Sequence, residues 1–194
     1  MTTAPSSKPL AMLIRHGATE WSESGQHTGR TDLPLLPAGE AQAEQLRSRL
    51  AGRQFAIVLC SPLERARRTA ELAGLTPFVE EPNLMEWDYG EAEGRTTDDV
   101  RQQYPGWGIW DGPWPGGETI DQVAARADKV VARIRELPTG AEVAVVSHGH
   151  MLRVLAARWL GTAPQAGRWF VLQTGTLSEL GWEHETATLQ RWNA

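Results

Sequence analysis

The apolar residues of the chain fall into short continuous runs that alternate with stretches of helical periodicity. Runs of strand length occupy 10–14, 56–60 and 142–146, and a shorter one occupies 78–80. Helical spacing follows over 37–50, 61–73, 119–136 and 150–160. This alternation predicts an α/β fold, a three-layer αβα sandwich with a largely parallel central sheet.

Local signals place the ends of several helices. Pro37 opens the first predicted helix, and Leu46 and Leu50 lie four residues apart on one face of it. Ser61 followed by Pro62 is typical of an N-cap with proline at the first helical position. Pro138-Thr139-Gly140 ends the helix that begins at 119.

The C-terminal part alternates instead, which predicts short strands over 169–172, 177–182 and 188–192 that add antiparallel edges to the sheet. These apolar strands could form the interface of a homodimer. We find no repeat and no second boundary, so residues 10–194 are interpreted as one domain behind a disordered tail, 1–9.

Periodicity disappears between 91 and 117, where glycine, proline and tryptophan are concentrated. A loop of this length in a compact domain is typical of a functional segment or a lid. Trp107, Trp110 and Trp114 could cover a substrate or pin the loop to the body of the protein.

Composition narrows the class of protein. The net charge is −5 and no basic stripe is present, which argues against nucleic acid as a partner. No apolar run has the length of a membrane span or a signal segment, and the single cysteine, Cys60, fits a reducing compartment and a buried place in the core. We therefore expect a cytoplasmic protein without a membrane partner.

Two histidines, each followed by glycine, stand at the ends of apolar runs: Arg15-His16-Gly17 and Ser147-His148-Gly149. Ligands of open α/β sheets bind at the carboxyl ends of the strands. A neutral imidazole can attack phosphorus and form a phosphohistidine, provided that fixed cations hold the phosphate oxygens. Arg15 supplies one such cation.

Two further cations are candidates for the same site. Arg65 lies at the start of the helix after the second strand, whereas Arg67 and Arg68 are interpreted as solvated. His148 could stabilise charge as an imidazolium or merely cap the next helix. A phosphate ester also needs an acid for its leaving oxygen; Glu86, between apolar and aromatic neighbours, is preferred over Asp88.

These motifs together resemble the histidine phosphatase superfamily, in its phosphoglycerate mutase-like branch. The resemblance rests on Arg15-His16-Gly17-Ala18-Thr19, Ser61-Pro62-Leu63-Glu64-Arg65-Ala66, Glu86 with 89–94, Gly117-Glu118-Thr119, and Ser147-His148-Gly149, in that order. It implies a nucleophilic His16, a phosphate pocket of Arg15, Arg65 and His148, and Glu86 as acid and then base. Thr28 and Gly29 match the substrate loop of the family.

Two positions depart from the common pattern: Ser22 stands where many members have Asn, and His150 where Asn or Gly is usual. The surrounding motifs resemble a narrower group of broad-specificity acid phosphatases and sedoheptulose-bisphosphatase-like enzymes. We expect substrate contacts from Gly17, Ser22, Thr28, Gly29, Trp87, Tyr89, Gly149 and His150. His27 could line the pocket or its rim, and His184 is expected to be exposed.

The predicted function is a phosphomonoesterase without metal or other cofactor that acts on a small phosphorylated metabolite. His148 and His150 could instead be a metal pair, but no HExxH or aspartate-rich cluster accompanies them. The alternatives are a phosphoglycerate mutase, and a binding module for phosphorylated ligands that lacks catalysis. The sequence leaves the substrate open, including the choice between monophosphate and bisphosphate.

Overall fold

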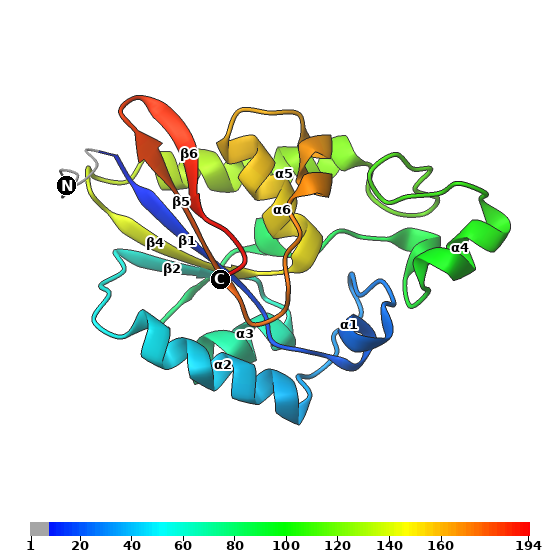
Figure 1. The fold of residues 1–194 in the computed structure, drawn as a ribbon, viewed down its shortest axis with the longest axis horizontal. Helices are drawn as coiled ribbons and strands as arrows, with labels where there is room; N and C mark the ends of the chain where they lie inside the picture. Colours follow the sequence, from blue (N-terminus) through cyan, green and yellow to red (C-terminus); the bar gives the residue numbers. More distant parts are fainter. Residues whose placement is uncertain (1–7) are drawn as a thin grey trace.

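Six strands form one sheet in the order β3-β2-β4-β1-β5-β6 (Figure 1). The computed structural model describes residues 8–194, and its strands are β1 (Leu10–Arg15), β2 (Ile57–Cys60), β3 (Val79–Glu80), β4 (Glu142–Ser147), β5 (Leu177–Glu183) and β6 (Thr186–Arg191). β1 to β4 run parallel, and β5 and β6 add antiparallel edges. The predicted largely parallel sheet is confirmed.

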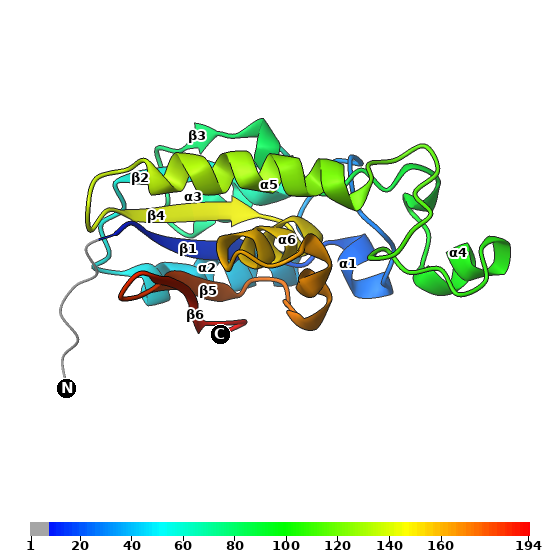
Figure 2. The same ribbon diagram turned by 90° about the horizontal axis from the view of Figure 1, so that it is seen from above.

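Helices cover both faces of the sheet (Figures 1 and 2). One layer contains α2 (Pro37–Leu50) and α3 (Glu64–Leu72), and the other contains α5 (Ile120–Arg135) and α6 (Gly149–Trp159). The strands between them have apolar side chains on both faces, as expected for a sheet buried on two sides. The three-layer αβα architecture predicted from the sequence is therefore present.

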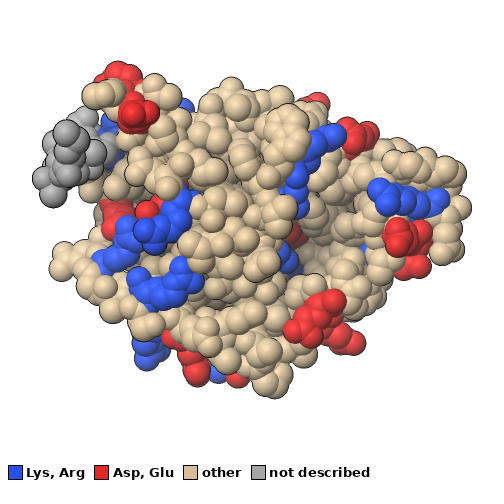
Figure 3. All heavy atoms as spheres, viewed as in Figure 1, with Lys and Arg blue, Asp and Glu red and all other residues tan. Residues whose placement is uncertain are grey.

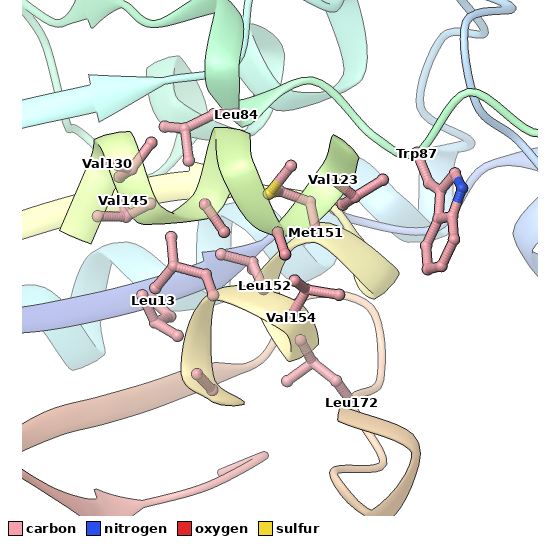
Figure 4. Close-up of a cluster of buried hydrophobic side chains, with 14 of the residues drawn as sticks. Leu13, Leu84, Trp87, Val123, Val130, Val145, Met151, Leu152, Val154 and Leu172 are labelled. Atoms are coloured by element: carbon pink, nitrogen blue, oxygen red, sulfur yellow. The ribbon is translucent and has the colours of Figure 1, made fainter. Parts of the chain in front are cut away.

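Side chains of β1 alternate between two apolar cores because successive strand residues point to opposite faces. Leu13 packs with α5 and α6, in the core that Figure 4 shows with Val123, Val130, Met151 and Leu152. Met12 and Ile14 pack with α2 and α3 on the other face, and Cys60 lies fully buried there. This rigid centre carries the strand ends at which the candidate residues lie.

The helix after β2 begins later than the sequence predicts. α3 starts at Glu64 with Leu63 at its N-cap, where no side chain caps the helix. Ser61 still belongs to the strand side, because its amide donates to Val146 O at 2.9 Å. The hydroxyl of Ser61 is used elsewhere, as described below.

The predicted strand over 169–172 is wrong. The segment leaves η3 (Pro164–Trp169) as a turn in which Phe170 N donates to Gly167 O. The carbonyls of Val171 and Leu172 accept from the side chains of Trp192 and Arg15 rather than from a strand. The alternation of apolar and polar residues therefore failed to predict the structure of 169–172, because side chains rather than a neighbouring strand bind its main-chain carbonyls.

The segment 91–117 contains more structure than its composition indicates. η2 (Gly90–Ala92) precedes α4 (Thr97–Gln103), which lies away from the sheet beyond the strand ends (Figure 1). Thr96 and Asp99 form a capping box at α4, and Thr19 and Ser22 form another at α1 (Glu20–Ser24). The Thr-x-x-Asp spacing at 96–99 was a readable signal for α4.

Further elements and findings complete the architecture. η1 (Pro82–Leu84) leads from β3 toward Glu86. Of the predicted tail 1–9, residues 1–7 lie outside the described residues, whereas the carbonyl of Pro9 accepts from Trp182 Nε1 at 2.8 Å. Between residues 8 and 194, no helix has both the length and the apolar character needed to span a membrane.

Candidate active site

His16 follows β1 directly, and its ring is locked in one tautomer. Nδ1 lies 2.7 Å from Gly17 O, and because a carbonyl only accepts, Nδ1 carries the proton and Nε2 keeps its lone pair. The side chain is 4% exposed. Burial, and then the charges of Arg65 and Arg15, hold the pKa of His16 well below its usual value. His16 is therefore a neutral imidazole with Nε2 available as a nucleophile.

Gly17 is fixed from two sides, which in turn fixes the acceptor of His16. The amide of Gly17 donates to Thr69 Oγ1 on α3 at 3.1 Å. A Cβ on Gly17 would lie 2.2 Å from Gly39 O at the start of α2, so no side chain fits. Gly17 thus acts by close packing, and Thr69 and Gly39 are supporting residues that sequence reasoning missed.

Arg65 is fully buried and holds the Thr28-Gly29 loop to α3. Nη2 donates to Thr28 O at 3.2 Å and to Gly29 O at 2.9 Å, and Nη1 donates to Thr31 O at 2.9 Å. The main-chain carbonyls of Thr28 and Gly29 thus bind Arg65, and the substrate contacts expected of the two residues stay a prediction. Glu93, which sequence reasoning missed, accepts from the amides of Gly29 and Thr31 and braces the same loop.

His148 lies beside His16, with ring centroids 5.1 Å apart. Arg65 Nε donates to His148 Nδ1 at 3.1 Å, so His148 carries its proton on Nε2, which donates to Ser61 Oγ at 2.7 Å. Burial and then Arg65 keep the pKa of His148 well below its usual value. The expected imidazolium is wrong for this structure; the residue occupies the N-cap position of α6 but caps no amide with its side chain.

Arg15 is the cation of the site with an unused donor. Nη1 donates to Leu172 O, whereas Nε is buried and has no hydrogen-bond partner within residues 8–194. Gly149 lies against this guanidinium, since a Cβ there would be 3.2 Å from Arg15 Cζ. An unpaired buried N–H is costly, and an oxyanion would satisfy it. The donor set thus fits a phosphate group.

Glu86 is buried, and main-chain amides donate to both oxygens of its carboxyl group. Oε1 accepts from Met151 N at 2.8 Å and from Trp87 N at 2.9 Å, and Oε2 accepts from His150 N at 3.0 Å. Two of these amides belong to the first turn of α6, where the free N–H groups of a helix favour an acceptor. The carboxyl group is therefore held at the same strand ends as Arg15 and His148.

The polar groups of the other residues predicted to contact substrate bind protein groups in this structure. Ser22 Oγ donates to Thr19 O at 2.9 Å and accepts from Thr19 N at 2.8 Å, so its hydroxyl caps α1 in this structure. Trp87 is fully buried with Nε1 on Glu118 O. Tyr89 Oη and His150 Nδ1 lie 2.6 Å apart and join the η2 segment to α6.

An aromatic cluster surrounds His150, defined here as His27, Trp87, Tyr89, Trp110 and His150. Ring centroids of the other four members lie 5.3–6.3 Å from that of His150. Burial lowers the pKa of His27 to about 4 and that of His150 well below its usual value, so both rings are uncharged at neutral pH. His27 and His150 are half-buried, whereas Trp87 and Tyr89 are buried.

The tryptophans of the 91–117 segment pin it to the body of the protein. Trp107 Nε1 donates to Pro113 O and Trp114 Nε1 donates to Ile109 O, each at 2.7 Å, and these two bonds hold the segment to itself. The rings of Trp110 and Trp114 contact Trp87, which lies outside the segment, with centroids 6.1 and 6.2 Å apart. Trp110 meets the Arg153 guanidinium of α6 at 4.7 Å. The prediction that these aromatic groups hold the loop agrees with the packing, while movement of the loop as a lid stays a prediction.

The His148 and His150 side chains were the candidate ligands of a metal ion. Across residues 8–194, no three His, Cys, Asp or Glu side chains are grouped as they would be around a metal ion. His148 makes its two ring hydrogen bonds to Arg65 and Ser61, and His150 makes one to Tyr89. The two histidines thus have separate partners.

The chain is similar in sequence to a family of phosphatases and to several of its named members. The family model "Histidine phosphatase superfamily (branch 1)" matches residues 11–194. An acid phosphatase of Mycobacterium tuberculosis is 42% identical over 176 residues, 89% of this chain and 86% of its own length. A sedoheptulose 1,7-bisphosphatase of Saccharomyces cerevisiae is 36% identical over 83% of this chain and 71% of its length.

A further relative and a solved structure are also similar to the chain. A protein of Photorhabdus laumondii named "probable phosphoglycerate mutase GpmB" is 31% identical over 93% of this chain and 88% of its length. The solved structure of a Mycobacterium tuberculosis open reading frame superposes with a TM-score of 0.90 at 39% identity, and covers 95% of this chain and 96% of that one. Both the sequence and the fold of the chain therefore match over nearly their whole extent.

Proposed function

Because the chain belongs to the histidine phosphatase superfamily, branch 1, we propose that it hydrolyses a small phosphorylated metabolite through a phosphohistidine on His16, without a metal. The family and the relatives named acid phosphatase and bisphosphatase make the chain a phosphatase. The observation that carries the mechanism is the tautomer of His16, with Nδ1–H on Gly17 O and Nε2 free.

The first step forms one bond and breaks one. The Nε2 lone pair of His16 attacks phosphorus, and the electron pair of the scissile P–O bond passes to the leaving oxygen. The protonated carboxyl of Glu86 gives that oxygen its proton, so the alcohol leaves neutral. The ring becomes cationic as Nε2 gains phosphorus, and Gly17 O, the acceptor of Nδ1–H, stabilises that charge.

The second step restores the site. The Glu86 carboxylate takes a proton from water, the water oxygen attacks phosphorus, and the P–N bond breaks with its electron pair returning to Nε2. Phosphate, neutral His16 and protonated Glu86 result. Arg15 supports both steps because its buried Nε is free to donate to a phosphoryl oxygen.

Arg65 and His148 have supporting roles in this proposal. Burial, and then the positive charge of Arg65, hold the pKa of both histidines well below its usual value, which preserves the lone pair of His16. His148 Nε2–H, which donates to Ser61 Oγ in the structure, can turn its hydrogen bond to a phosphoryl oxygen. In this proposal the positive charge that attracts the phosphate comes from the arginines and not from an imidazolium.

A matched pair of substitutions tests this function. His16→Asn removes the nucleophile, and His184→Asn makes the same change at an exposed histidine in the β5–β6 turn. We expect p-nitrophenyl phosphate hydrolysis to fall by at least about a thousandfold for His16→Asn and to stay near wild type for His184→Asn. Near-normal turnover of His16→Asn would sink the mechanism.

Phosphoglycerate mutase is the second candidate, favoured by the relative from Photorhabdus laumondii. A mutase transfers the phosphoryl group back to its substrate instead of to water. Incubation of 3-phosphoglycerate with a bisphosphoglycerate primer separates the two, because a mutase yields 2-phosphoglycerate and a phosphatase yields inorganic phosphate. A non-catalytic binding module would yield neither.

A further inference from the structure

We propose that the site selects phosphomonoesters of uncharged alcohols that carry a planar ring, and that it disfavours substrates with a second phosphate. The inference rests on the proposed phosphatase function, since it concerns the leaving-group side of the same site. Two observations carry it: the engagement of the nearby arginines and the uncharged rings of the aromatic cluster.

Arginines around the site other than Arg15 and Arg65 already have partners. All nineteen Lys and Arg residues of the chain lie within the described part. Arg30 lies 3.7 Å from Asp88 and 3.5 Å from Glu118. Glu118 also pairs with Arg126 at 2.8 Å. These side chains are neutralised by carboxylates and offer little to a second anion.

Arg153 is the strongest candidate for a second phosphate, because it lies on α6 one turn after Gly149. Its Nε donates to Gly167 O at 2.9 Å and its Nη2 to Arg168 O at 3.0 Å. Trp110 covers its guanidinium at 4.7 Å. Arg168 in turn pairs with Asp111 at 2.6 Å. The guanidinium of Arg153 is thus bound to η3 and to the aromatic cluster.

The segment 82–118, which supplies Glu86 and most of the aromatic cluster, is strongly acidic. It contains eight Asp and Glu residues but only two arginines, Arg95 and Arg101. Arg95 bonds within its own segment, to Asp99 O and to Gln103, and Arg101 lies 3.7 Å from Asp98. Both arginines of this segment are thus held by their own neighbours and offer little to a second phosphate.

The aromatic cluster borders both arginines of the phosphate pocket. His150 follows Gly149, which lies against Arg15, and Tyr89 lies 3.0 Å from the place of a Cβ on Gly29, whose carbonyl binds Arg65. Figure 3 shows the surface hollowed beyond the strand ends, between α6, α1 and α4. An alcohol esterified to the bound phosphate therefore meets uncharged rings.

Ring faces favour a planar partner over an alkyl chain. Aromatic pairs contribute beyond the area that they bury, which corresponds to about two- to tenfold in affinity. His27, Trp110 and His150 are the half-buried members of the cluster, whereas Trp87 and Tyr89 are buried. The neutral state of the two histidines keeps this contact intact at neutral pH without attracting an anion.

The test compares esters matched for the basicity of the leaving oxygen. 2-Phenylethyl phosphate and butyl phosphate are both primary alkyl esters and differ in the ring. Fructose 1,6-bisphosphate and fructose 6-phosphate share the ester at C6 and differ in the second phosphate. For the wild-type protein we expect kcat/KM about tenfold higher for 2-phenylethyl than for butyl phosphate, and lower for the bisphosphate than for fructose 6-phosphate.

Two tryptophan variants locate the effect. Trp110→Leu removes a ring of the cluster and should bring the ratio of phenylethyl to butyl ester toward one. Trp182→Leu is the control, because Trp182 packs on Trp159 at 5.3 Å and binds Pro9 at the opposite end of β1. That variant should keep the wild-type ratio.

The outcomes separate the inference from the function on which it rests. Equal kcat/KM for the two alkyl esters, or a bisphosphate preferred about tenfold, would overturn the selectivity while leaving the phosphatase intact. Loss of the ring preference in Trp182→Leu as well as Trp110→Leu would also overturn it. Failure to hydrolyse any ester, p-nitrophenyl phosphate included, would defeat the proposed function itself.

Discussion

Thr69 offers a sharp test of how the nucleophile is held. Its buried hydroxyl accepts from the amide of Gly17 at 3.1 Å and donates to Arg65 O at 2.7 Å, so it ties α3 to the turn that carries His16. Thr69→Val keeps the shape of the side chain and leaves the Gly17 N–H without an acceptor. Thr69→Ser keeps the hydroxyl and loses only a methyl group.

The expected loss of stability differs between the two variants, because Thr69→Val loses a hydrogen-bond acceptor and Thr69→Ser loses a methyl group. An unsatisfied buried amide costs about 1–3 kcal/mol of unfolding free energy, whereas a buried methyl group contributes about 0.8 kcal/mol. For a chain of this length, 1 kcal/mol lowers Tm by about 2–4 °C. Thr69→Val should therefore melt roughly 2–12 °C below wild type, and Thr69→Ser nearer to wild type.

Thermal unfolding and p-nitrophenyl phosphate kinetics check the prediction together. Because Gly17 O fixes the tautomer of His16, release of the Gly17 amide should also lower kcat of Thr69→Val by about tenfold. Thr69→Ser should stay within about threefold of wild type. A valine variant that melts at or above the serine variant, with unchanged kcat, would refute the reasoning.

Three other predictions follow from the site. Burial keeps four histidines, His16, His27, His148 and His150, neutral in the folded protein, whereas the histidines of the unfolded chain titrate near pH 6.5. The free energy of unfolding should therefore be highest above pH 6.5 and should fall below it by up to about 1.4 kcal/mol per pH unit per histidine. Equal stability in urea unfolding at pH 5 and pH 7 would contradict this. His27→Gln should flatten that dependence between pH 4 and about 6.5, the window set by its two pKa values. Gly149→Ala should raise KM about tenfold by crowding Arg15, while Gly108→Ala, whose Cβ meets nothing within 4 Å, should not; equal KM values would exclude a role of Gly149 in shaping the pocket.

Periodicity was sufficient for most of the fold. The helix over 37–50 and the one-sided apolar face of α5 were readable because their side chains pack against a single core. α1 and α4 escaped notice because five- and seven-residue helices show little periodicity and depend on capping boxes. The false strand over 169–172 arose because its carbonyls serve the side chains of Arg15 and Trp192.

The site was partly readable for a different reason. The order of the motifs pointed to His16, Arg15, Arg65, Glu86 and His148, and the structure places them together at the strand ends. Their protonation and orientation depend on long-range partners such as Thr69, 52 residues from Gly17, and Ser61, 87 residues from His148. Such contacts carry no local pattern, which is why the sequence did not indicate the Arg65 bond that keeps His148 Nδ1 unprotonated or the amides of α6 that bind Glu86.

Trapping of the phosphoryl group tests the central claim most directly. Wild-type protein mixed with an excess of p-nitrophenyl phosphate is quenched in alkali, where phosphoramidates survive, and its peptides are mapped by mass spectrometry. We predict one phosphoryl group on the peptide that contains His16, absent from His16→Asn and longer-lived in Glu86→Gln, which cannot deprotonate the attacking water. Turnover by the wild type without phosphorylated His16, or with the label on another residue, would contradict the mechanism.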